Sequence, residues 1–143
     1  DEAASLGITI CLETHGGLLA SGATSAELVR QIGKPNVGIN YDPGNVIFYG
    51  NTRPETDIEA AAPYVKHMHF KDQIGGYQVW NFPPTGTGEI DFKPIFAALE
   101  RVGFRGPCSV EIEFQGEPWP SLEDVNAAVA QSYRFARQFV PAP

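Results

Sequence analysis

Short apolar segments alternate with amphipathic segments four times along the chain, and this alternation constrains the fold more than any other feature of the sequence. Four segments that are rich in β-branched and other apolar residues, and bounded by glycine, proline or charged residues, predict strands. They cover 7–13, 36–42, 64–72 and 106–114, and the helices predicted after them cover 24–33, 55–63, 91–103 and 121–140. This order is typical of parallel strands that are joined by right-handed crossovers and covered by helices. We therefore predict an α/β fold with parallel strands, as either an open three-layer sheet or a barrel.

The predicted helices carry recognisable start signals. Thr24 is followed three residues later by Glu27, and this spacing predicts a capping box that begins the first helix at residue 24. Asp91 and Ser121 stand where N-caps of the last two helices are expected. The segment 73–90, between the third strand and the helix that follows it, predicts a long loop.

An ionisable residue stands at or near the end of every predicted strand. Side chains alternate between the two faces of a strand, so His67, His69 and Lys71 share one face of the third strand. Parallel α/β proteins bind ligands at the carboxyl ends of their strands. We therefore expect one set of strand-end side chains to converge there: Glu13, Asp42, His69 and Glu111.

Three carboxylates gathered in one place repel one another unless a cation lies between them, so their convergence predicts a divalent metal site. Oxygen-rich ligands with one nitrogen suit Mn²⁺, Mg²⁺ or Co²⁺ and tolerate Zn²⁺. Each residue alone also has a structural explanation. An acidic residue at a strand end is often solvated or caps a helix, and a buried histidine is often a hydrogen-bonded core residue.

Charge and composition exclude some classes of function. The 143-residue chain has a net charge of −7, which disfavours nucleic-acid binding because that needs a cationic surface. No apolar run approaches 18 residues and the first residues do not form a signal peptide, so we expect a soluble, cytoplasmic protein without a membrane partner. Cys11 and Cys108 are expected to be free thiols on opposite faces of the sheet.

Five motifs, in order along nearly the whole chain, resemble the xylose isomerase-like TIM-barrel superfamily: ICLETHGG, VGINYDPGN, VKHMHFKD, GTGEIDF and GFRGPCSVEIE. That superfamily includes sugar phosphate isomerases and epimerases, ketose 3-epimerases, hydroxypyruvate isomerases, inosose dehydratases and endonuclease-IV-like enzymes. The resemblance implies that residues 1–143 are one domain, the parallel (β/α)4 half of a TIM barrel that corresponds to strands five to eight. The N-terminal half of the barrel would then be absent.

The same resemblance implies a site and a chemistry. The four metal ligands would be Glu13, Asp42, His69 and Glu111. Glu13 and Glu111 would also be the catalytic acid and base, which move a proton next to the carbonyl of a sugar or sugar phosphate through an enediolate. The expected function is a divalent-metal-dependent isomerase or epimerase. The alternatives are an inosose-dehydratase-like lyase, a non-catalytic metal-binding half-barrel that self-associates, and a phosphodiesterase.

Three further residues are candidates for substrate contact. His67 aligns with a substrate-side position in the family, and the alternatives are a hydrogen bond to a ligand or a structural role. His15 follows Glu13 by two residues and is expected to line the pocket. Lys71 is expected either to contact a substrate anion or to neutralise carboxylates, including a salt bridge with Asp72 or Glu113.

Two departures from the family pattern matter. Many relatives have a histidine three residues after the aspartate of strand six, where this chain has Asn45, and this weakens a multi-zinc nuclease interpretation. Half a barrel also leaves two open sheet edges. We expect these edges to pair with a missing N-terminal half or with a second copy in a homo-oligomer. Because residues that shape the substrate would lie in the other half, the sequence leaves open whether this half is active alone.

Overall fold

A computed structural model describes residues 1–114 and 117–140, and it contains the four-stranded parallel sheet that the sequence predicts. The strands lie in the order β1-β2-β3-β4, with Glu13 paired to Asn40, Tyr41 to Met68, and His69 to Ser109. They are shorter than predicted and end within one residue of the polar residues that the sequence singled out. Their bounds are Ile10–Glu13 for β1, Val37–Tyr41 for β2, Val65–Phe70 for β3 and Cys108–Val110 for β4.

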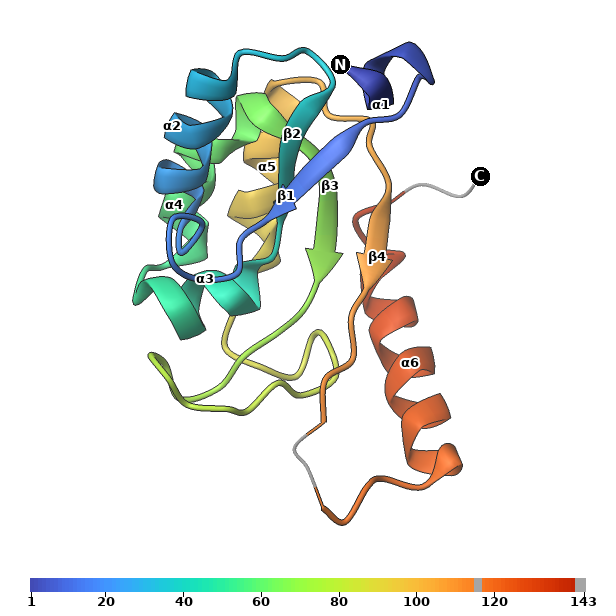
Figure 1. The fold of residues 1–143 in the computed structure, drawn as a ribbon. Helices are drawn as coiled ribbons and strands as arrows, with labels where there is room; N and C mark the ends of the chain where they lie inside the picture. Colours follow the sequence, from blue (N-terminus) through green and yellow to red (C-terminus); the bar gives the residue numbers. More distant parts are fainter. Residues whose placement is uncertain (115–116, 141–143) are drawn as a thin grey trace.

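Six α-helices and one short 3-10 helix lie within the described part of the chain (Figure 1). Helices α2, α4 and α5 lie along one side of the sheet, and α6 packs near β4. Their bounds are Glu2–Ser5 for α1, Gly22–Ile32 for α2, Pro43–Gly50 for α3, Pro54–Ala61 for α4, Phe92–Arg101 for α5 and Leu122–Ala136 for α6, with the 3-10 helix at Ala62–Tyr64.

The N-cap predictions were right for two helices and wrong for one. Asp91 accepts a hydrogen bond from the Lys93 N–H, and Ser121 caps α6 as expected. Helix α2 begins earlier than predicted, because Ser21 forms the capping box with Thr24. Glu27 instead accepts a hydrogen bond from the Gln31 amide, at 2.8 Å, on the exposed face of α2.

Helix α3 follows β2 directly and was not predicted. The residues Asp-Pro-Gly-Asn at its start read as a turn in sequence. In the structure Asp42 is the N-cap and Pro43 is the first helical residue, a position where proline's fixed φ and missing N–H are tolerated. The consequence for the site is direct, because the residue that ends β2 also begins α3.

The core lies between the sheet and the helices α2, α4 and α5. Ile39, Tyr41, Met68 and Phe70 point to this side and are fully buried against helical side chains such as Ile95. Complete burial of each such side chain contributes about 1.5–3 kcal/mol, so this face fixes the register of the strands. Because side chains alternate, the neighbouring polar residues point to the opposite face.

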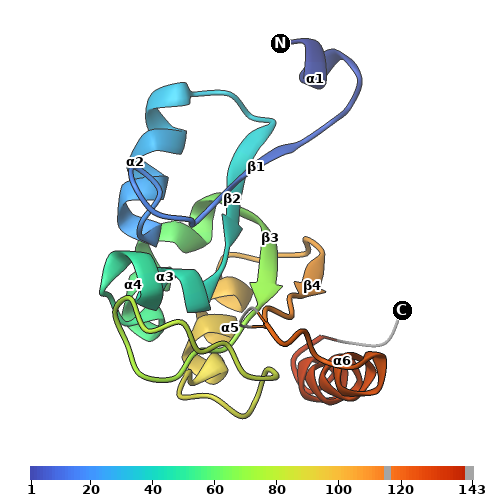
Figure 2. The ribbon, with the colours of Figure 1, turned by 60° about the horizontal axis from the view of Figure 1, so that its bottom comes forward.

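That opposite face of the sheet has no helical layer among the described residues, as Figures 1 and 2 show. Strands β1 and β4 are its edges, each with one partner strand within the described ranges. Cys11 lies on this open side beside His67, whereas Cys108 packs against the core, and both thiols are free as expected. Burial raises the pKa of the Cys108 thiol to about 11. Within residues 1–114 and 117–140, no helix is long and apolar enough to cross a membrane.

Candidate metal centre

The carboxyl ends of the strands bring together the four side chains that the sequence singled out. Glu13 is the last residue of β1, and His69 lies one residue before the end of β3. Glu111 follows β4, and its backbone N–H donates to the Phe70 carbonyl at 3.1 Å, which extends the strand pairing by one residue.

Asp42 is the most constrained of the four. Its side chain is fully buried, and its Oδ1 accepts a hydrogen bond of 2.9 Å from the Asn45 N–H at the start of α3. The Thr14 hydroxyl accepts from the Asp42 N–H at 2.8 Å and donates to the Asp42 carbonyl at 3.1 Å. The helix cap and this hydroxyl bridge hold the second carboxylate oxygen, Oδ2, towards the centre of the site.

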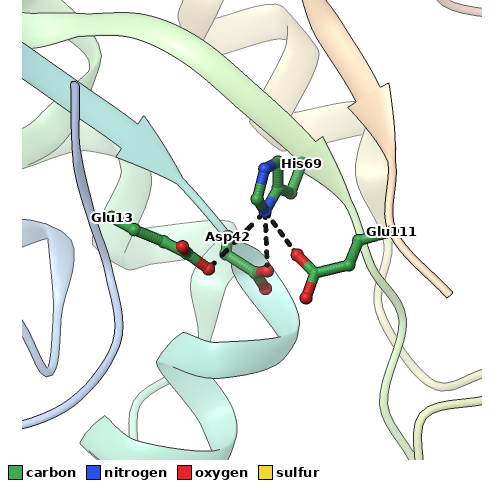
Figure 3. Close-up of side chains that lie close together, drawn as sticks. All are labelled: Glu13, Asp42, His69 and Glu111. Atoms are coloured by element: carbon green, nitrogen blue, oxygen red, sulfur yellow. Dashed lines mark hydrogen bonds and ion pairs between the residues drawn. The ribbon is translucent and has the colours of Figure 1, made fainter. Parts of the chain in front are cut away.

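The four side chains point towards one another (Figure 3). Nδ1 of His69 lies 2.5 Å from Oε2 of Glu111, 3.2 Å from Oδ2 of Asp42 and 3.6 Å from Oε1 of Glu13. One donor atom from each residue lies within 4.8 Å of all the others. This clustering uses one residue from the end of each strand.

These residues fit a divalent metal ion. An ion with donors about 2.0–2.2 Å away places neighbouring donors about 3 Å apart and opposite donors about 4.3 Å apart. The donor atoms here span a comparable range. In addition, Oε2 of Glu111 is buried and accepts no well-directed hydrogen bond from the described residues, although it faces His69. A cation between the four side chains would satisfy this oxygen.

The electrostatics show how strongly the site favours positive charge. Burial lowers the pKa of His69, but its close contacts with the carboxylates of Asp42 and Glu111 outweigh burial and raise the pKa to about 10. The close contact with His69 lowers the pKa of Glu111 to about 2. Burial raises the pKa of Asp42 to about 6, in spite of the His69 hydrogen bond. A proton on His69 therefore occupies the position that suits a cation, and an ion would displace it because a coordinating imidazole nitrogen must be unprotonated.

Behind the four residues lies a second set of polar contacts. The Asn45 amide donates from Nδ2 to Oε1 of Glu13 at 3.1 Å. Its Oδ1 accepts a hydrogen bond of 3.1 Å from Nζ of Lys71, which also donates to Oε1 of Glu111 at 3.1 Å. Lys71 also forms an ion pair with Glu113, one of the two salt bridges that the sequence suggested.

The other predicted contact residues lie at different depths. His67 lies below His69, with Nε2 2.8 Å from the Ser109 hydroxyl, and burial followed by the His69 charge lowers its pKa. His15 is exposed on the loop after β1, and its Nε2 lies 3.4 Å from the Tyr49 hydroxyl. Neither histidine belongs to the four-residue cluster.

Asn40 is a site residue whose role sequence reasoning missed. Its Nδ2 lies 3.0 Å from Nε2 of His69, the nitrogen opposite the carboxylates, while its Oδ1 is buried without a hydrogen-bond donor in the described ranges. Rotation of the amide by 180° would let Oδ1 accept from a protonated Nε2, the state required when Nδ1 holds a metal. The available signal was its position two residues before Asp42, on the same face of β2.

Comparison with known proteins agrees with the fold. A family model described as xylose isomerase-like TIM barrel matches residues 1–139. The chain is 29% identical to the ketose 3-epimerase of Arthrobacter globiformis over an alignment 119 residues long, which covers 78% of this chain and 37% of that protein. It is 27% identical to the inosose dehydratase of Histophilus somni over an alignment 129 residues long, which covers 78% of this chain and 43% of that protein.

A solved structure, a xylose isomerase domain protein from Planctomyces limnophilus, superposes on 96% of this chain and 50% of its own, with a TM-score of 0.72 and 27% identity. The chain thus spans about half the length, or less, of the proteins that it matches. The family match covers nearly the whole chain, and the parallel sheet agrees with it. This chain therefore belongs to the xylose isomerase-like TIM barrel family.

Proposed function

We propose that Glu13, Asp42, His69 and Glu111 bind one divalent metal ion, and that this ion serves an isomerase or epimerase acting on a sugar or sugar phosphate. The observation that carries the proposal is the convergence of four donor atoms, one from the end of each parallel strand, within 4.8 Å. The relatives named as a ketose 3-epimerase and an inosose dehydratase support a sugar-like substrate. Mn²⁺, Mg²⁺, Co²⁺ and Zn²⁺ all suit this donor set.

Glu13 and Glu111 are suited to move the proton. They come from the two outer strands, so they approach the site from opposite sides, with Asp42 and His69 between them. One carboxylate would remove a proton from the carbon next to the carbonyl, leaving an enediolate, and the other would return a proton to it. A bound divalent ion would supply polarisation of the carbonyl oxygen. His67 and His15 are proposed as contacts with the remainder of the substrate.

A lyase is the second candidate, and the similarity to inosose dehydratases favours it. The first step would be the same removal of a proton next to a carbonyl. The two functions differ afterwards, because a lyase expels a hydroxyl group as water instead of returning the proton. Detection of a dehydrated product would identify the lyase.

We also propose that β1–β4 correspond to strands five to eight of a TIM barrel. Four more strands would then cover the open face of the sheet and pair with the edges β1 and β4. They would come from the remainder of a longer chain or from a second copy of this one. A half-barrel that binds metal without catalysis is the remaining alternative, and it predicts metal binding without proton exchange.

Metal analysis combined with two substitutions tests the proposal. We expect about one divalent ion per chain, and exchange of a substrate proton with deuterated solvent when ketoses and ketose phosphates are supplied. Glu13→Gln and Glu111→Gln should each lower the exchange rate by about 10²–10⁴-fold, which is the usual contribution of a positioned acid or base. Glu123→Gln, on the exposed first turn of α6, is the matched control. Unchanged metal content and exchange in both site variants would disprove the assignment.

A further inference from the structure

Asn45 connects three parts of the site through one side chain and one backbone group. Its N–H donates to Oδ1 of Asp42 at 2.9 Å, its Nδ2 donates to Oε1 of Glu13 at 3.1 Å, and its Oδ1 accepts from Lys71 at 3.1 Å. The residue is buried, so these contacts are shielded from water. The side-chain amide thereby uses one of its two N–H groups and one of its two oxygen lone pairs.

Lys71 continues the connection to the other side of the site. Its side chain is only 2% exposed, and its ammonium contacts Oδ1 of Asn45, Oε1 of Glu111 and a carboxylate oxygen of Glu113. The centroid of the Phe82 ring lies 4.5 Å from Nζ of Lys71. An ammonium has three N–H donors, and three protein oxygens already accept from it. A substrate anion would have to displace one of them.

We propose that Asn45 and Lys71 form a buried bridge that positions the two glutamates, with Asn45 holding Glu13 and Lys71 holding Glu111. Both are positioning residues, since each acts through a glutamate and not through contact with the substrate. The inference rests on the proposed function, in which these glutamates bind the metal and move the proton. The bridge links carboxylates from the two outer strands, β1 and β4, through α3 and the residue that follows β3.

The bridge is separable from the role of Asn45 in starting α3. The cap of α3 uses the side chain of Asp42 and the backbone N–H of residue 45, which every substitution except proline retains. Asn45→Leu keeps a branched side chain with the same number of heavy atoms but removes both side-chain contacts. Asn45→His is the conservative variant, because a neutral imidazole has one donor nitrogen and one acceptor nitrogen. Lys71→Met removes the ammonium and keeps a long side chain.

A double-mutant cycle on the full chain tests the bridge, with Mn²⁺ affinity as the first readout. We expect Asn45→Leu and Lys71→Met each to weaken Mn²⁺ binding about 10- to 100-fold, as for residues that orient metal ligands, and Asn45→His to restore part of the loss. The double variant should lose less than the product of the two single losses, because the contact between Oδ1 of Asn45 and Nζ of Lys71 couples the two residues. Unchanged binding in the folded Asn45→Leu variant, or losses that multiply in the double variant, would overturn the bridge.

Urea unfolding of the metal-free protein supplies the second readout and separates the two proposals. If the wild type binds no Mn²⁺, the proposed function fails, but the bridge still predicts that the second substitution changes the unfolding midpoint less once the first is present. Additive changes in the midpoint would overturn the bridge whatever the outcome with Mn²⁺. Circular dichroism of each variant confirms that it folds before either comparison is made.

Discussion

At the scale of single residues, the site is a balance of charge around one imidazole. Three carboxylate oxygens face Nδ1 of His69, and in the metal-free protein their charge is offset by a proton on that nitrogen together with the Lys71 ammonium beside Glu111. The pKa of His69 rises to about 10 for this reason, while the pKa of Glu111 falls to about 2. The protonation state of His69 is therefore linked both to folding and to metal binding.

This linkage predicts how the metal-free protein responds to alkali. His69 has an ordinary pKa of 6.5 in the unfolded chain and about 10 in the folded one, so its contribution to stability is complete below pH 6.5 and is lost as pH rises towards 10. Glu111 acts in the opposite range, because its contribution is complete above its ordinary value of 4.5 and is lost as pH falls towards 2. The Asp42 pKa is raised from 3.8 to about 6, so its effect lies below pH 7.

Between pH 7 and 9 we therefore expect the urea midpoint of the metal-free protein to fall steadily. This range also lies below the window in which the Cys108 thiol affects stability, which opens at its ordinary pKa of 9.0 and extends to about 11. His69→Gln should flatten the slope, and saturating Mn²⁺ should remove it, because a coordinated imidazole takes up no proton at Nδ1. An equal slope in wild type and His69→Gln would show that another group causes it.

At the scale of secondary-structure elements, sequence patterns predicted the strands well and the helix starts less well. The four strands and their parallel arrangement follow from apolar segments that alternate with amphipathic ones. Buried parallel strands are nearly continuous apolar runs, so they can be recognised from the sequence alone. The missed helix α3 is eight residues long and opens with Pro-Gly, residues that are also typical of turns. The start of α2 was misplaced because Thr24 belongs to a capping box in which Ser21 is the N-cap.

The same distinction applies to the site. The convergence of four side chains could be predicted because each stands near the end of a strand and points to the same face of the sheet: Glu13, Asp42, His69 and Glu111. The contact between Lys71 and Asn45 could not, because it joins side chains 26 positions apart and depends on which rotamers the packing allows. Periodicity gives the face of a residue, but it does not give its partner.

A buried carboxylate on α4 supports the start of α2, and this contact predicts a measurable loss of stability. Asp57 accepts hydrogen bonds from the Gly22 N–H at 2.5 Å, the Ala23 N–H at 3.2 Å and the Tyr41 hydroxyl at 3.1 Å. Asp57→Ala leaves these donors without their acceptor, so we expect a loss of about 2–4 kcal/mol in the free energy of unfolding.

Ser21→Ala is the matched comparison for Asp57→Ala. It removes the exposed cap of the same helix and should cost only about 1 kcal/mol. Chemical denaturation of both variants gives the two values directly. If Asp57→Ala cost no more than Ser21→Ala, the contact between α2 and α4 would not be a significant support for the fold.

At the scale of the whole molecule, helices cover one face of the sheet, and no helix in residues 1–114 and 117–140 covers the other. Strands β1 and β4 each have a single partner strand within the described ranges, and unpaired parallel edges readily accept another strand. The apolar residues at the β1 edge are partly exposed, with Ile10 at 44%. In the proteins that this chain matches, the aligned part is about half of the total length.

We expect the 143-residue chain, studied alone, to self-associate through these edges. Two copies related by a two-fold axis would pair β1 of one with β4 of the other on both sides, and this would close eight strands around the metal centres. Sedimentation of the wild type should show a dimer. Ile10→Lys places a charge at the β1 edge and should shift the equilibrium to monomer, whereas Leu18→Lys, which alters an exposed loop residue outside the edge, should leave the dimer intact. A wild type that sediments as a monomer at all concentrations would exclude pairing between copies and assign the open face to strands from elsewhere in a longer chain.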